Sequence, residues 1–373
     1  MIADSPRMNA YAQALRQAVQ PGSVVLDIGT GTGIMALLAC QLGARRVYAI
    51  EPDDIIQVAR EIAAANGCAD RIEFLQNLSA QVSLPERADV VISDLRSVLP
   101  LFALHLPSIV DARRRFLAPG GTLIPLRDTL WAAVVEAPEI YSQHTAPWDG
   151  HRYGLNMEAA RRMATNAWQK ARMKPQQLLV QPQCWATLDY TVLEGPDASA
   201  QITWTAARPG IGHGFIVWFD ALLTEGVCLS NAPGAPEVIY GSAFFPWSTP
   251  VAIASGDSVS LTLQAHLVGK DYVWSWATRV LGPGDPPQVK ANFQQSTFFG
   301  APLSLGTLQK EAASHLPSLN EDGQIDQFIL AQMDGETPLE ELARRLLDRF
   351  PARFAHWQDA LTRVGVLSAK YSR

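Results

Sequence analysis

The segment from Val24 to Gly33 constrains the fold of this chain more than any other part of its sequence. Residues 24–28 are mostly apolar, glycines follow at Gly29, Gly31 and Gly33, and a helical pattern begins at Ile34. Glycine lets a backbone turn sharply and approach a ligand without a Cβ in the way. The segment therefore predicts a buried strand, a tight ligand-binding turn and a helix, which together begin an α/β domain.

The alternation of apolar runs and helical patterns continues to about residue 126. Strands are predicted at 23–28, 46–51, 71–76, 88–94 and 122–125, and helices at 34–42, 55–65 and 107–117. Uninterrupted apolar strands that alternate with helices indicate a parallel sheet covered on both faces. We therefore expect an α/β Rossmann-like domain over residues 1–127.

The pattern changes after residue 127 to short strands separated by Gly, Pro and Asn turns. They are predicted at 128–135, 178–192, 200–206, 215–223, 251–253, 258–267 and 272–280, and one helix is predicted at 157–171. This pattern is typical of an antiparallel β-barrel or sandwich. We expect a barrel domain over 128–303 with a helical arm at about 138–172. Helices at 325–333, 338–349 and 352–364 predict a helical C-terminal module over 304–373.

The composition excludes several classes of protein. The chain has 373 residues, of which 48% are hydrophobic and 18% charged, as in globular proteins of more than one domain. A net charge of −6 argues against nucleic acid as the main partner. The four widely spaced cysteines predict no metal site, and no apolar run approaches the length of a membrane helix. No secretory leader is recognisable, so we expect a cytoplasmic protein without a membrane partner.

Two acids at the ends of neighbouring strands indicate the ligand of the glycine turn. Asp27 precedes the turn, and Glu51 ends the next strand, where a carboxylate can accept both hydroxyls of a ribose. The spacing from Gly31 to Ala36 also satisfies the relaxed fingerprint of dinucleotide folds. However, Asp27 would repel a pyrophosphate and suits the ammonium and sulfonium groups of S-adenosylmethionine. These residues predict an S-adenosylmethionine-dependent methyltransferase; a tight turn without a ligand is the remaining alternative.

Four segments outside the glycine turn resemble the protein arginine methyltransferases, or a divergent bacterial branch of that superfamily. They are residues 4–11, 84–93, 153–157 and 214–220, and the resemblance extends over roughly residues 1–280. It implies that Arg7 binds the cofactor carboxylate and that adenine lies beside the turn containing Ser79. It also implies a homodimer formed through the helical arm. The helix that covers the cofactor in the family is not expected here, because the chain starts too late to supply it.

The sequence departs from this family where the family binds its substrate. The family holds a guanidinium group between two glutamates of one loop, and these positions are Asp94 and Ala103 here. Arg96 puts a positive charge between them, and Pro246 stands in place of a histidine on the barrel. We therefore expect methylation of nitrogen or oxygen on a small molecule or peptide. Genuine protein arginine methylation and a non-catalytic cofactor-binding scaffold stay open as alternatives.

Two residues are candidates for catalysis. Asp94 follows a parallel strand at its carboxyl end, where α/β sheets bind their ligands, and it could orient a nucleophile or accept its proton. His105 lies on the next segment and could act as a base near neutral pH. The tryptophans of the barrel are expected to pack in its core.

The helices after residue 338 faintly resemble small peptide-binding modules such as the pyrroloquinoline-quinone biosynthesis D-type domain. This resemblance would suit the delivery of a peptide or carrier-bound substrate. A helical cap on the barrel and a dimer seam are the alternatives.

Overall fold

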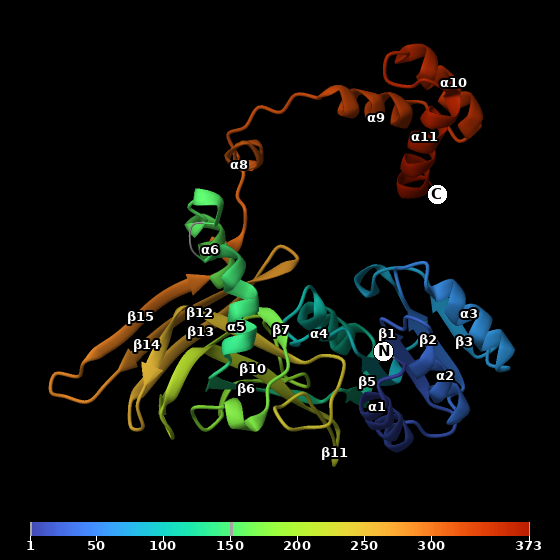
Figure 1. Ribbon diagram of the computed structural model, residues 1–373. Helices are drawn as coiled ribbons and strands as arrows, with labels where there is room; N and C mark the ends of the chain where they lie inside the picture. The colour runs from blue at the N-terminus through green and yellow to red at the C-terminus, as the bar shows by residue number, and fades with distance from the viewer. Residues whose placement is uncertain (1, 150–151, 373) are drawn as a thin grey trace. The chain divides into compact units, whose positions relative to one another are not determined.

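The computed structural model describes residues 2–149 and 152–372 (Figure 1). The chain divides into two compact units, Met1–Pro302 and Leu303–Arg373. Each unit has a hydrophobic core of its own.

The first unit begins with a parallel sheet in the order β3-β2-β1-β4-β5. Its central strand, β1 (Val24–Ile28), is buried at every residue because helices cover the sheet. This arrangement confirms the predicted Rossmann-like fold. The remaining strands are β2 (Arg46–Ile50), β3 (Ile72–Leu75), β4 (Ala88–Ser93) and β5 (Leu117–Ile124). The helices are α1 (Ser5–Ala18), α2 (Ile34–Gln41), α3 (Ile56–Ala65), the short η1 (Ser79–Gln81) and α4 (His105–Arg115).

Strand β5 begins earlier than the sequence predicts. The expected strand started at residue 122, after Gly120 and Gly121, but β5 already begins at Leu117. Gly120 adopts a positive φ of 76°, and the pairing of β5 with β4 shifts its register between Ala88 and Val90. The two glycines therefore bend this strand instead of preceding it.

The rest of the first unit consists of two antiparallel sheets, with the orders β7-β12-β10-β6-β8 and β15-β14-β13-β9, and β11 pairs with β10. The predicted antiparallel β domain is confirmed, and its tryptophans, including Trp218, Trp247, Trp274 and Trp276, lie in its core. The strands are β6 (Arg127–Val135), β7 (Gln169–Ala171), β8 (Gln183–Asp189), β9 (Ala198–Thr205), β10 (Gly210–Thr224), β11 (Val227–Ser230), β12 (Ser242–Ile253), β13 (Ser258–Val268), β14 (Asp271–Leu281) and β15 (Val289–Ser296).

The helical arm differs from its prediction at the C-terminal end. It contains α5 (Pro138–Thr145), η2 (Ala146–Trp148), η3 (Arg152–Gly154) and α6 (Glu158–Thr165), and the expected helix over 157–171 is therefore wrong beyond Thr165. Residues 169–171 form β7 instead, at the edge of the sheet. From Lys170 to Lys174 exposed cations alternate with the buried Ala171 and Met173, which is the period of a strand. The short helix α7 (Thr297–Gly300) ends the unit, and η4 (Pro175–Gln177) follows β7.

The second unit is helical, as expected. It contains α8 (Leu305–Glu311), α9 (Glu321–Ala331), α10 (Leu339–Arg349) and α11 (Trp357–Tyr371). Helix α11 begins later than predicted because Asp359 accepts a hydrogen bond from the backbone N–H of His356 and fixes the first turn there. Residues of the last three helices, including Ile329, Leu346 and Val364, form the core of this unit. No helix in the described part of the chain is long and apolar enough to span a bilayer.

Candidate active site

The glycine turn after β1 is held by Asp27. Its carboxylate accepts a hydrogen bond from the Thr30 hydroxyl at 2.6 Å and another from the backbone N–H of Ala36 at 3.1 Å. Gly29, Gly31 and Gly33 all have positive φ, between 54° and 82°. A Cβ at Gly33 would lie 3.0 Å from the Cβ of Ala59 in α3, so the turn also needs glycine to pack against this helix. Burial raises the pKa of Asp27 to about 6, although both hydrogen bonds act in the opposite direction.

Glu51 faces the glycine turn from the end of β2. One carboxylate oxygen accepts from the backbone N–H of Gly31 at 3.0 Å, and the other accepts from that of Asp53 at 3.1 Å. The adjacency of β1 and β2 in the parallel sheet brings these segments together. The predicted pair of acids, Asp27 and Glu51, therefore lies on one side of the same turn.

Two adjoining cavities open over this turn, and Gly29 and Glu51 line both. The first has a volume of about 240 Å³ and is lined by charged residues that include Arg7, Asp27 and Asp94. The second has about 250 Å³ and a mainly apolar lining. Together they suit an elongated ligand with a charged end, a polar middle at Glu51 and an apolar ring. Lining residues of the second cavity include Leu78, Ser79, Leu95, Phe102, Ala103 and His105.

Asp94 follows β4 and is held by two side chains. Nε of Arg7 donates to its carboxylate at 2.5 Å, and a second guanidinium nitrogen of Arg7 forms an ion pair with it. The Tyr240 hydroxyl lies 2.7 Å from both carboxylate oxygens. Asp4 caps α1 and fixes Arg7 at the start of this helix. Burial opposes the charge of Arg7, but Asp94 and Tyr240 outweigh this effect and raise the pKa of Arg7.

Arg96 is completely buried behind Asp94. Its guanidinium forms an ion pair with Asp128 of β6 at 3.2 Å and lies 3.9 Å from Asp94. It also lies over the ring of Phe219, 4.9 Å from the centroid. Burial alone would lower the pKa of Arg96. Asp128 and the surrounding groups together outweigh this effect and raise the pKa above its ordinary value, so this side chain is charged. The positive charge expected in this loop therefore lies inside the protein, paired with a carboxylate.

Asp128 has a second partner. The Tyr190 hydroxyl donates to it at 2.5 Å. Burial raises the pKa of Asp128, and Arg96 and Tyr190 moderate this shift.

His105 begins α4 and packs edge-on against Tyr190, with ring centroids 5.8 Å apart. Its side chain is buried, and neither ring nitrogen has a hydrogen-bond partner within the described residues. Burial, with a smaller effect of the Arg96 charge, lowers the pKa of His105 to about 3. The imidazole is therefore neutral at physiological pH and a weak base.

Ser79 lies in η1 at the wall of the apolar cavity. Its carbonyl accepts a hydrogen bond from Arg115 of α4 at 2.8 Å, which ties this turn to the helix. Ala103, at the position of the second expected glutamate, adopts a positive φ of 41° and lines the same cavity without a charge.

The sequence did not single out Tyr240 or Asp128 as part of this site. Tyr240 lies 146 residues from Asp94, on the loop between β11 and β12. Its hydrogen bond forms only because the β domain packs against the parallel sheet, and a local pattern carries no signal of such a contact. The charge of Arg96 was a partial signal, because a buried guanidinium requires a carboxylate partner.

Two family models match the first unit. Residues 9–125 match the ribosomal protein L11 methyltransferase (PrmA), and residues 127–273 match the arginine methyltransferase oligomerization subdomain. The two matches adjoin where the parallel sheet gives way to the antiparallel strands.

Curated relatives match the same part of the chain. It is 32% identical to the probable protein arginine N-methyltransferase 6 of Arabidopsis thaliana over 229 residues, 59% of this chain and only 52% of that protein. It is 26% identical to protein arginine N-methyltransferase 1 of Dictyostelium discoideum over 272 residues, which are 71% of this chain and 80% of that protein.

Solved structures share the fold. The protein arginine methyltransferase 10 of Arabidopsis thaliana matches with a TM-score of 0.70 at 23% identity, over 80% of this chain and 96% of that one. The PRMT1 enzyme–prozyme heterotetrameric complex with AdoHcy from Trypanosoma brucei matches with a TM-score of 0.71 at 20% identity. This match covers 79% of this chain and 95% of that one. With the matched families and the cavities at the glycine turn, these findings assign the chain: it belongs to the protein arginine methyltransferase family of class I S-adenosylmethionine-dependent methyltransferases.

Proposed function

We propose that this protein transfers a methyl group from S-adenosylmethionine to a neutral nitrogen or oxygen atom of a small molecule or peptide. The observation that carries this proposal is the charge balance around Asp94. Two buried guanidinium groups, Arg7 and Arg96, face two carboxylates, Asp94 and Asp128. A cationic acceptor would enter this cluster without a net negative charge to compensate its own, and would lose its hydration.

The cavities at the glycine turn suit the cofactor. Arg7 is the proposed partner of its carboxylate, because Nη1 makes only a weak bond to the Met8 sulfur at 3.3 Å and can donate elsewhere. Asp27 is the proposed partner of the ammonium group, and Glu51 of the ribose hydroxyls. Ser79 lines the apolar cavity in which the adenine would lie. When bound, S-adenosylmethionine supplies a methyl group activated by its sulfonium.

Asp94 is the proposed catalytic residue. It lines the charged cavity, and Arg7 and Tyr240 hold its carboxylate in one orientation. A carboxylate fixed in this way aligns an acceptor by a hydrogen bond and receives its proton as the nitrogen or oxygen attacks. The predicted role of His105 as a base is not part of this proposal, because a pKa of about 3 leaves the imidazole little proton affinity.

Two other functions compete with this one. Protein arginine methylation is favoured because the relatives are named protein arginine N-methyltransferases. It would require Asp94 to bind the guanidinium alone, since Ala103 supplies no second carboxylate. A non-catalytic cofactor-binding scaffold would keep the cavities and lose the transfer.

A transfer assay with isotope-labelled S-adenosylmethionine separates the three. The acceptors are arginine-rich peptides, neutral amines and amides, and hydroxylated metabolites, and Asp94→Asn is the inactive control. Label in neutral acceptors supports the proposal, and label in peptide arginine overturns it. Tight binding of S-adenosylhomocysteine without transfer to any acceptor supports the scaffold.

Assembly and location complete the proposal. We infer a homodimer through the arm, since Tyr153 and Leu155 near its tip are 96% and 59% exposed and residues 127–273 match an oligomerization subdomain. Sedimentation of the wild type and of Tyr153→Ser/Leu155→Ser tests it, and a monomeric wild type excludes it.

Four further features stay predictions: the domain boundaries 1–127, 128–303 and 304–373, the cytoplasmic location, the bacterial branch and the lack of a nucleic-acid partner.

A further inference from the structure

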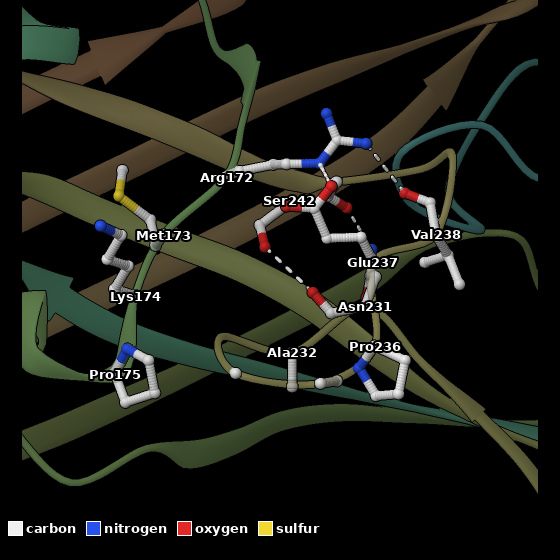
Figure 2. A pocket seen from close by; sticks show the side chains of 13 residues that line it. Arg172, Met173, Lys174, Pro175, Asn231, Ala232, Pro236, Glu237, Val238 and Ser242 are labelled. Carbon is white, nitrogen blue, oxygen red and sulfur yellow. Dashed lines mark hydrogen bonds and ion pairs between the residues drawn. The ribbon is translucent and has the colours of Figure 1, made fainter. Parts of the chain in front are cut away.

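A cavity of about 190 Å³ lies beside β7 and is separate from the two cavities at the glycine turn (Figure 2). One wall is formed by residues 172–175 and the other by the loop of residues 231–238 between β11 and β12. The floor contains the buried Asn231 and Ser242, whose hydroxyl donates to the Asn231 carbonyl at 3.2 Å. It is a formed pocket with a polar floor.

The residues that line this cavity carry a net positive charge. Arg172 and Lys174 line it, and Lys170 precedes them on the same face of the strand, while Glu237 is the carboxylate in its lining. Arg172 and Glu237 are 3.5 Å apart and largely exposed, so their pairing is weak. Two cations, Arg172 and Lys174, therefore line the cavity against one carboxylate.

Exposed cations also protect the edges of sheets, and β7 is an edge strand. The side chains of Lys170 and Arg172, however, reach toward the loop. The ammonium of Lys170 donates to the Ile239 carbonyl. Arg172 donates to the Val238 carbonyl at 3.3 Å, as Figure 2 shows. The cations are thus gathered around the cavity.

The same loop connects the cavity to the catalytic residue. Tyr240, which bonds Asp94, follows Val238 of the cavity wall by two residues, or at most about 7 Å of chain. Asn231 of the floor also donates to the Val98 carbonyl at 3.2 Å, within the segment between β4 and α4 that lines the apolar cavity. A group bound here would lie close to an acceptor at Asp94.

We propose that this cavity binds an acidic side chain, aspartate or glutamate, of a peptide substrate, near the residue to be methylated. This inference rests on the proposed function and narrows its acceptor to a peptide with a carboxylate close to the methylated position. The positive cavity complements the carboxylate, while the polar floor accommodates the peptide groups beside it. By binding this aspartate or glutamate, the cavity would select among peptide substrates. The cluster at Asp94 has no net charge and does not provide this selection.

The probe is an acetylated and amidated tetraglutamate peptide, titrated by calorimetry in parallel with the tetraglutamine peptide. The variant Arg172→Gln/Lys174→Gln removes two cations of the cavity, and Lys270→Gln/Arg279→Gln removes two exposed cations of the β13–β14 hairpin as a matched control. We expect tetraglutamate to bind preferentially and to lose roughly tenfold in affinity in the first variant, with no change in the control.

Charge reversal sharpens the test. Arg172→Glu/Lys174→Glu is expected to bind a tetralysine peptide better than tetraglutamate. Equal binding of tetraglutamate and tetraglutamine by the wild type, or equal losses in both double glutamine variants, overturns the inference. S-adenosylhomocysteine is titrated in the same experiments: if it binds and tetraglutamate does not, the subsite is wrong and the proposed function stands; if it does not bind, the proposed function itself fails.

Discussion

The Tyr240 hydroxyl lies 2.7 Å from each carboxylate oxygen of Asp94 and accepts a hydrogen bond from Nε of Arg7 at 2.9 Å. Burial, followed by the charge of Asp94, raises the pKa of Tyr240, so this hydroxyl keeps its proton throughout the working range. One phenol from the β domain thus orients a carboxylate and an arginine of the parallel-sheet domain. The proposed acceptor site depends on both domains.

Removing this hydroxyl should slow methyl transfer more than it weakens cofactor binding. In Tyr240→Phe the ring can still pack edge-on against Phe219, but Asp94 loses its donor. We expect kcat to fall by roughly 10- to 100-fold, the effect of about 1.4–3 kcal/mol. The affinity for S-adenosylhomocysteine, measured by calorimetry, should change by less than about threefold.

The matched control is Tyr272→Phe, which removes a hydroxyl bonded to the Pro196 carbonyl in the β domain. It should leave kcat unchanged. Equal rates in Tyr240→Phe and the wild type would mean that the orientation of Asp94 does not limit the reaction.

Asp27 should make stability depend on pH in an unusual direction. Its pKa is raised to about 6 by burial, so the folded chain binds this proton more tightly than the unfolded chain. The resulting stabilisation is present below pH 4 and is lost as the pH rises through 6. Between pH 4 and pH 7.5, the unfolding free energy of the wild type should therefore fall by up to about 3 kcal/mol relative to that of Asp27→Asn.

Denaturant unfolding at both pH values measures this difference. Asp89→Asn is the control, because Asp89 also accepts a backbone hydrogen bond, from Val24 at 2.8 Å, but is exposed. A difference between Asp27→Asn and the wild type that stays constant with pH would contradict the raised pKa.

The buried pair of Arg96 and Asp128 should show strong coupling in a double-mutant cycle. Arg96→Met or Asp128→Ala alone leaves an unpaired buried charge and should destabilise the fold by about 3–5 kcal/mol. The double variant leaves neither charge and should recover most of this loss. Unfolding free energies of the four proteins measure the coupling, and strictly additive effects would show that the two side chains do not depend on each other.

His105 should contribute little to proton transfer. Because its pKa is lowered to about 3, its protonation cannot produce an inflection near pH 6.5 in the rate profile. We expect His105→Asn to keep kcat within about threefold and to leave the profile unchanged. The control is His266→Gln, which replaces an exposed histidine and should also leave kcat and the profile unchanged. A loss of two orders of magnitude in kcat with unchanged cofactor affinity would restore His105 as a catalytic candidate.

The sequence predicted those features that local patterns encode. The period of apolar residues gave the parallel sheet, and the strand ends placed Asp27 and Glu51 beside one turn, where the structure has them. The helix expected through residue 171 failed because pairing with β12 made a strand of Gln169–Ala171. The contact of Tyr240 with Asp94 and the pair of Arg96 with Asp128 join distant segments, so no local spacing could reveal them.

A competition assay tests the charge balance at Asp94 most directly. Peptides that differ only at one central position, with arginine, glutamine, histidine or serine, are mixed in equal amounts with the enzyme and labelled S-adenosylmethionine. Mass spectrometry then locates the labelled methyl groups. The balanced cluster of Arg7, Arg96, Asp94 and Asp128 predicts label on a neutral side chain and none on arginine. Preferential labelling of the arginine peptide would contradict it.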